Sequence, residues 1–192
     1  MSSENSLSSV YHNLYTNGSG YSTPWLDEPR IAYALADLDG GSLIDIGCGR
    51  GVLVNEYMRL YPDAVVKAVD FENVEGLPED VFVSVDLENE PEKLLDLPCH
   101  QVTCTDVLEH IDEDRVPVLL SVISRICDVA FVSVANHSDF YGGVELHKTQ
   151  RPKEWWDEVL SRYFLINGEE VFYNGRSWYY QLESIAVRGT DL

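Results

Sequence analysis

The chain has 192 residues, of which 45% are hydrophobic and 11% aromatic, so it is long enough to bury the core of one globular domain without disulfides or metals. It carries 33 acidic and 13 basic residues, a formal net charge of −20, and a surface of that sign repels a phosphate backbone. A nucleic-acid substrate is therefore disfavoured, and the charge indicates either ordinary solubility or adaptation to high salt.

The N-terminal segment, residues 1–24, is rich in Ser, Asn and Gly and is predicted to be flexible. Tyr11, Tyr15 and Tyr21 are interleaved in it. These rings either form an apolar lid over a ligand site or pack on the surface for stability. Residues 25–192 are predicted to form a single domain.

Helical and strand patterns alternate through the rest of the chain. They predict helices at about 25–38, 51–60, 90–96, 112–126 and 152–161, and strands at 42–46, 64–69, 81–85, 100–105, 128–134, 162–173 and 177–188. Pro117 lies inside the fourth helix, which should therefore start late or kink. Asn174-Gly175 indicates a hairpin turn between the last two strands.

This alternation predicts an α/β fold with three layers. Its centre should be a doubly wound, seven-stranded, mostly parallel sheet with an antiparallel strand from the C-terminal hairpin. Residues 135–151 contain no predicted element and are interpreted as a loop.

The sequence contains no pattern typical of a membrane span, a secretory signal or a zinc site. The sequence contains no run of 18 apolar residues, and its N-terminus lacks the pattern of a secretory signal, so we expect a cytoplasmic protein without a membrane partner. The four cysteines (Cys48, Cys99, Cys104 and Cys127) lack the spacing of a zinc site. We therefore expect reduced thiols and no bound metal.

The strongest motif is LIDIGCGRG, residues 43–51, in which an apolar strand runs into a glycine-rich turn and then into a helix. Glycines in such a turn allow the backbone to approach a ligand closely. The spacing G-x-G-x-G differs from the dinucleotide pattern G-x-G-x-x-G, which disfavours a nicotinamide cofactor.

Two acidic residues follow at the ends of the next strands. Asp70 ends the second strand, 19 residues after Gly51, and Asp86 is expected at the end of the third. Both should lie at the carboxyl edge of the sheet, where ligands of open α/β sheets bind. Asp70 either accepts both hydroxyls of a ribose or simply caps a turn.

Four segments, LIDIGCGRG, AVDFE, VSVDLEN and TDVLEHI, resemble in order and spacing the motifs of class I (Rossmann-like) S-adenosylmethionine (SAM) dependent methyltransferases of the small-molecule type. The resemblance covers about residues 42–134. It implies a seven-stranded sheet with an antiparallel last strand pair, and SAM as the cofactor.

The resemblance also implies roles for individual residues. Asp45 would orient the glycine loop near the SAM amino group, and Asp70 would hold the ribose. Asp86 would lie near the adenine, with Leu87 covering the ring, and Asp106 would lie near the methionine moiety. The full implied cofactor-binding set is Asp45, Gly47, Cys48, Gly49, Gly51, Asp70, Phe71, Asp86, Leu87 and Asp106.

Methyl transfer to a protonated acceptor needs a base, and histidine is suited to this near neutral pH. The candidates are His147, His137 and His110, which all follow predicted strands. His147 could alternatively tie down its own loop. Glu109-His110 belongs either to the site or to the solvated start of a helix.

The predicted function is therefore SAM-dependent transfer of a methyl group to an O or N atom of a small molecule. The alternatives are a protein or nucleic-acid methyltransferase, and a catalytically silent SAM-binding regulatory module. The Asn/Asp-Pro-Pro-Tyr/Phe motif of amino-directed nucleic-acid enzymes is absent, since Thr105-Asp106-Val107-Leu108 occupies that position. The acceptor molecule and the oligomeric state are left open.

Overall fold

A computed structural model describes Val10 and residues 28–186 of the chain. The N-terminal segment with its three tyrosines lies outside the described residues, so its flexibility and its lid role stay predictions.

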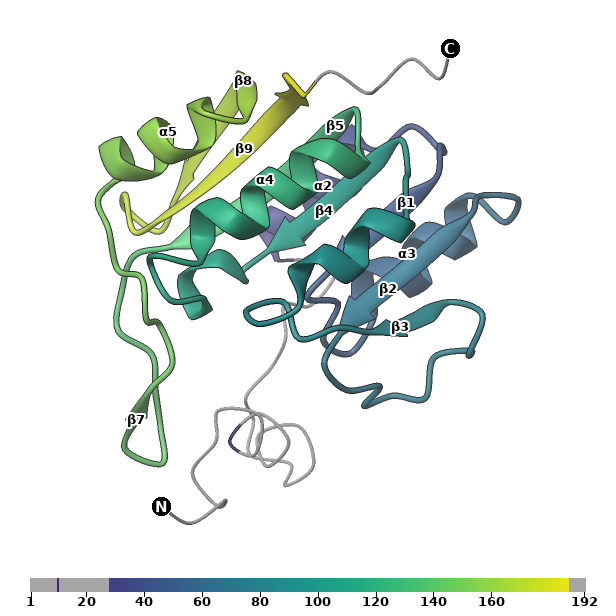
Figure 1. The fold of residues 1–192 in the computed structure, drawn as a ribbon, viewed down its shortest axis with the longest axis horizontal. Helices are drawn as coiled ribbons and strands as arrows, with labels where there is room; N and C mark the ends of the chain where they lie inside the picture. Colours follow the sequence, from purple (N-terminus) through teal and green to yellow (C-terminus); the bar gives the residue numbers. More distant parts are fainter. Residues whose placement is uncertain (1–9, 11–27, 187–192) are drawn as a thin grey trace.

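The centre of the fold is the seven-stranded sheet that the sequence predicts, with the order β3-β2-β1-β4-β5-β9-β8 (Figure 1). Neighbouring strands from β3 to β5 are parallel, and β9 is antiparallel to both β5 and β8. The strands are β1 (Leu43–Ile46), β2 (Val66–Asp70), β3 (Phe82–Ser84), β4 (Gln101–Thr105), β5 (Val129–Ala135), β8 (Phe164–Phe172) and β9 (Ser177–Ser184).

Helices cover both faces of this sheet and bury two apolar clusters against it. On one face, α2 (Pro29–Asp37) and α3 (Val52–Leu60) contribute Ile31, Leu53 and Tyr57. The other face is covered by α4 (Val116–Ile126), α5 (Lys153–Ser161) and the 3₁₀ helix η2 (Pro91–Asp96), which contribute to the second apolar cluster. None of the helices in the described part is long and apolar enough to cross a bilayer.

Near the site, the late start expected from Pro117 is confirmed, and the predicted end of the third strand is corrected. The predicted helix at 112–126 begins only at Val116, which puts Pro117 in the first turn, where a missing N–H breaks no helical hydrogen bond. A separate 3₁₀ helix, η3 (Leu108–His110), precedes it. The third strand ends at Ser84, so Asp86 lies in the following turn and not at the strand end.

The segment predicted as a loop, residues 135–151, contains a small hairpin. Strands β6 (Phe140–Tyr141) and β7 (Val144–Glu145) pair antiparallel. They are joined by Gly142 and Gly143, which both have positive φ. Two-residue strands carry too little alternation to be read from a sequence, because periodicity needs several residues to appear. The predicted hairpin at Asn174-Gly175 is confirmed.

Candidate functional site

The glycine loop joins β1 to α3 at the carboxyl edge of the sheet. Gly47, Gly49 and Gly51 have φ of 71°, 52° and 67°, in the left-handed region that favours glycine. A Cβ atom on Gly47 would lie 2.2 Å from Cγ2 of Val107, so that position has no room for a side chain. The loop is therefore built for close approach of its backbone to its surroundings.

Asp70 holds this loop from the end of β2. One carboxyl oxygen accepts a hydrogen bond from the Gly49 N–H at 2.8 Å, and the other accepts one from the Phe71 N–H at 2.7 Å. Asp70 is buried, and burial raises its pKa in spite of these two bonds.

Asp45 lies beneath the loop on β1. It is buried and accepts a hydrogen bond from Thr103 Oγ1 at 2.7 Å, and burial raises its pKa to about 7. Cys48 is buried beside it, and burial together with the charges of Asp45 and Asp70 raises the pKa of its thiol. Cys48 is therefore a packed residue and not an activated nucleophile.

The segment after β3 forms a tight turn around Asp86. Its exposed carboxylate accepts hydrogen bonds from the backbone N–H groups of Glu88 and Asn89, both at 3.1 Å, and from Asn89 Nδ2 at 2.8 Å. Partial burial acts to raise the pKa of Asp86, but these bonds outweigh it and the pKa is lowered. Leu87 is partly buried and packs against the core.

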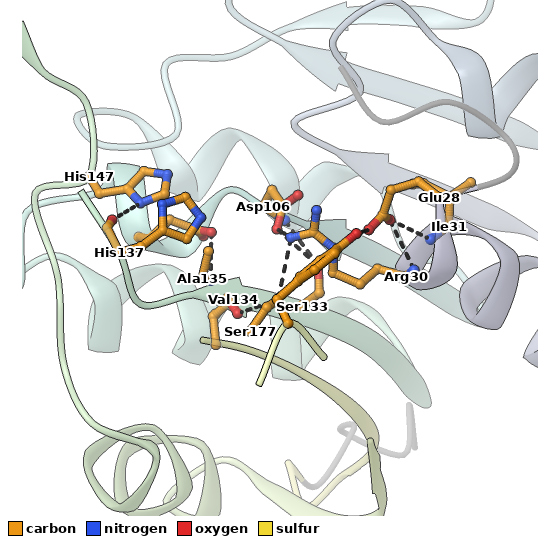
Figure 2. Close-up of polar contacts among 12 residues, drawn as sticks. Glu28, Arg30, Ile31, Asp106, Ser133, Val134, Ala135, His137, His147 and Ser177 are labelled. Atoms are coloured by element: carbon orange, nitrogen blue, oxygen red, sulfur yellow. Dashed lines mark hydrogen bonds and ion pairs between the residues drawn. The ribbon is translucent and has the colours of Figure 1, made fainter. Parts of the chain in front are cut away.

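Asp106 follows β4 in a left-handed conformation, with φ of 55°. Its carboxylate forms an ion pair with Arg30 of α2, and its backbone N–H donates to the Ser133 carbonyl at 3.1 Å. Figure 2 shows the two side chains pointing toward each other. Burial raises the pKa of Asp106, and the charge of Arg30 opposes that rise.

Sequence reasoning missed Arg30. It also donates to Glu28 at 2.7 Å and to Ser177 Oγ at 3.3 Å, and its guanidinium lies 5.4 Å from the centre of the Tyr173 ring. No local signal marks it, because its partner Asp106 is 76 residues away along the chain.

The three candidate histidines lie together. The ring centres of His110 and His147 are 4.7 Å apart, and those of His137 and His147 are 4.8 Å apart, as Figure 2 shows for the second pair. His110 comes from η3, and His147 from the segment after β7, which is bound to η3 through Thr149.

Hydrogen bonds define the tautomers of two of these rings. Nδ1 of His147 lies 2.6 Å from the His137 carbonyl, and Nδ1 of His110 lies 3.1 Å from the Leu146 carbonyl. A carbonyl only accepts, so each Nδ1 carries the proton and each Nε2 of the neutral ring has a lone pair. Burial lowers the pKa of His147, and burial with the neighbouring His147 lowers that of His110 to about 3.

Glu109 is fully buried, so the interpretation of Glu109-His110 as a solvated helix start is wrong for this residue. Its Oε1 accepts a hydrogen bond from the Ala135 N–H at 2.7 Å. The sequence alone could not reveal that Glu109 is buried, since burial depends on which segments pack over a residue.

The segment after β7, which carries His147 and Lys148, is also tied to the turn around Asp86. Lys148 Nζ lies 2.7 and 2.8 Å from the two carboxyl oxygens of Glu88, and it lies 3.3 Å from a carboxyl oxygen of Asp112. The turn after β3 and the segment that carries His147 therefore share one ion-pair cluster. Among the described residues, no group of three or more His, Cys, Asp and Glu side chains is arranged to hold a metal ion.

A seven-stranded sheet of this order, with a glycine loop after β1 and a carboxylate at the end of β2, defines a class I SAM-dependent methyltransferase domain. The chain belongs to the methyltransferase domain family, whose model matches residues 26–190. SAM is the cofactor of this class. No curated protein matches the sequence.

Solved structures share the fold at low sequence identity. PH0226 from Pyrococcus horikoshii OT3 is 12% identical with a TM-score of 0.64, over 80% of this chain and 86% of that one. The Burkholderia thailandensis 1,6-didemethyltoxoflavin-N1-methyltransferase, solved with its substrate and S-adenosylhomocysteine, is 20% identical with a TM-score of 0.64, over 93% and 85%. The small RNA methyltransferase HEN1 is 18% identical with a TM-score of 0.62, but this chain covers only 25% of its length.

Proposed function

We propose that this chain transfers a methyl group from SAM to an O or N atom of a small molecule. The observation that supports this most directly is the contact of the Asp70 carboxyl with the Gly49 backbone at the carboxyl edge of the sheet. That edge is where ligands of open α/β sheets bind, and a carboxylate there can accept ribose hydroxyls.

The cofactor would lie across this edge. The glycine loop would pass along its methionine and ribose parts, Asp70 would bind the ribose, and Asp45 would support the loop near its amino group. Asp86 and Leu87 would meet the adenine. Asp106, turned toward Arg30, would lie where the methionine moiety meets the acceptor.

When bound, SAM supplies an electrophilic methyl group on a sulfonium sulfur. The residues of this chain would align the acceptor for in-line attack and remove its proton. His147 would act as the base, because its Nδ1–H is bonded to the His137 carbonyl and its lowered pKa leaves Nε2 unprotonated at neutral pH. Nε2 of His147 would take the proton that the acceptor atom loses on methylation.

The charge of the chain supports a small acceptor. A net charge of −20 opposes binding of a polynucleotide, which depends on displacement of counterions by Lys and Arg. Arg30 and Lys148, the cations beside Asp106 and His147, are already paired with carboxylates. The methyltransferase solved with 1,6-didemethyltoxoflavin is 20% identical, so its likeness supports a small acceptor at the level of the fold alone. The likeness to HEN1 supports an RNA acceptor at the level of the fold alone.

Calorimetric titration with SAM and S-adenosylhomocysteine, at low and at molar salt, tests the proposal, with NAD as the control ligand. Binding of both sulfur compounds and not of NAD is expected. A folded protein that binds neither would contradict the proposal. Tight SAM binding without turnover over a broad panel of acceptors would favour the silent regulatory module instead.

A further inference from the structure

Glu109 forms hydrogen bonds to both of the segments that carry His137 and His147. Its carboxyl oxygen Oε1 accepts the Ala135 N–H at 2.7 Å, and its backbone carbonyl accepts the Thr149 N–H at 2.9 Å. Ala135 ends β5 two residues before His137, and Thr149 lies two residues after His147. One buried residue therefore holds both segments that carry these histidines, and His110 is its direct neighbour in the chain.

The second carboxyl oxygen has no hydrogen-bond partner among the described residues, although it is fully buried. Leaving a buried polar atom unpaired costs about 1–3 kcal/mol, so such a residue is expected to have a use that repays this cost. An apolar side chain of the same size would avoid this cost but would leave the Ala135 N–H without its partner.

The surroundings favour the uncharged form of this group. Burial and the neighbouring Asp106 raise the pKa of Glu109 well above its usual range, although its bond to Ala135 and the charge of Arg30 act in the other direction. A protonated carboxyl group can still accept the Ala135 N–H through Oε1.

We propose that Glu109 is a positioning residue for methyl transfer, which sets the relative placement of His137 and His147 by holding the end of β5 and the segment after β7. This inference rests on the proposed role of His147 as the base. The polar contact at Oε1 is the essential part, and a negative charge on Glu109 is not required.

A pair of variants separates these two properties. Glu109→Gln keeps an oxygen that can accept the Ala135 N–H but cannot ionise, whereas Glu109→Met keeps nearly the same length without any acceptor. Glu79→Ala, at an exposed position, serves as the control. The full chain would be labelled with ¹⁵N-histidine, and NMR would report the tautomer and pKa of each ring, so no acceptor molecule is needed for the measurement.

We expect Glu109→Gln and Glu79→Ala to match the wild type, with His147 protonated at Nδ1 and with its pKa lowered. In Glu109→Met, the His147 signals should show mixed tautomers and a pKa closer to 6.5. Affinity for S-adenosylhomocysteine should change less than about twofold in all three variants, since the hydrogen bonds given for Glu109 join it to Ala135 and Thr149 and not to the glycine loop. Turnover on any acceptor should fall about tenfold or more in Glu109→Met, because misplaced groups lose alignment.

Unchanged His137 and His147 signals in Glu109→Met would overturn the proposal. A Glu109→Gln variant that behaves like Glu109→Met would also overturn the proposal. In that case the charge of Glu109, and not its hydrogen bond to Ala135, would set the placement of the histidines. Failure of the wild type to bind S-adenosylhomocysteine would contradict the proposed function. That result is measured separately from the NMR signals of the histidines, so the two failures can be told apart.

Discussion

The carboxyl group of Asp70 accepts a hydrogen bond of 2.8 Å from the backbone N–H of Gly49, so the end of β2 directly supports the glycine loop after β1. The two residues are 21 positions apart and meet because parallel β1 and β2 end at the same edge. Asp70→Ala should weaken SAM binding about tenfold to hundredfold, which corresponds to loss of one or two hydrogen bonds to a charged group. Calorimetry checks this, with exposed Asp63→Ala as the control, and equal affinity in both variants would remove the ribose assignment.

Gly47 has both a positive φ and no room for a Cβ atom, because Val107 lies 2.2 Å from where that atom would be. Gly76 has a similar φ of 68° and open space around it, so it is a matched control. Gly76→Ala should cost about 1 kcal/mol of unfolding free energy from backbone strain alone. Gly47→Ala should cost about 1–3 kcal/mol more through overpacking. Denaturant unfolding measures both values, and equal losses would show that Val107 moves aside freely.

His147→Gln should leave SAM affinity unchanged and lower turnover about 100-fold or more, the usual contribution of a positioned base. Because burial lowers the pKa of His147, the wild-type rate should fall on acidification only below pH 6.5, the usual histidine value. Steady-state rates between pH 4 and 9, on an acceptor found by screening, would show this limb. A parallel loss of SAM binding and turnover would make His147 structural.

The titrations of His110 and Asp45 should change the free energy of unfolding in opposite directions as the pH rises. His110 has a folded pKa of about 3, so between pH 3 and 6.5 the unfolded chain binds the extra proton and acid destabilises the fold. Asp45 has a folded pKa of about 7, so from about pH 4 to 7 the folded chain holds the extra proton and rising pH destabilises it.

Thermal unfolding of His110→Gln and Asp45→Asn from pH 4 to 7 tests both signs. Relative to the wild type, the His110 variant should lose less stability toward low pH, and the Asp45 variant should lose less toward neutral pH. Curves that run parallel to the wild type across this range would contradict the shifted pKa values.

Arg30→Gln should lower the free energy of unfolding by about 2 kcal/mol, because the partly buried carboxylate of Asp106 loses its charged partner. Arg59→Gln, which breaks an exposed pair with Glu56, is the control and should cost less, because solvent screens exposed pairs. Urea denaturation gives both values. Equal effects would mean that Arg30 and Asp106 stabilise the domain no more than a surface pair does.

The sequence by itself determined the order along the chain of the seven strands of the main sheet and of the α-helices between them, the glycine loop and the placement of Asp70. These follow from local patterns, since strand periodicity and the shared edge of parallel strands need no knowledge of side-chain packing. Only the tertiary structure decided that Arg30 pairs with Asp106, that His137 and His147 are in contact, and that Glu109 is buried. Such contacts join segments far apart in the chain, and burial is a property of what packs over a residue and not of the residue itself.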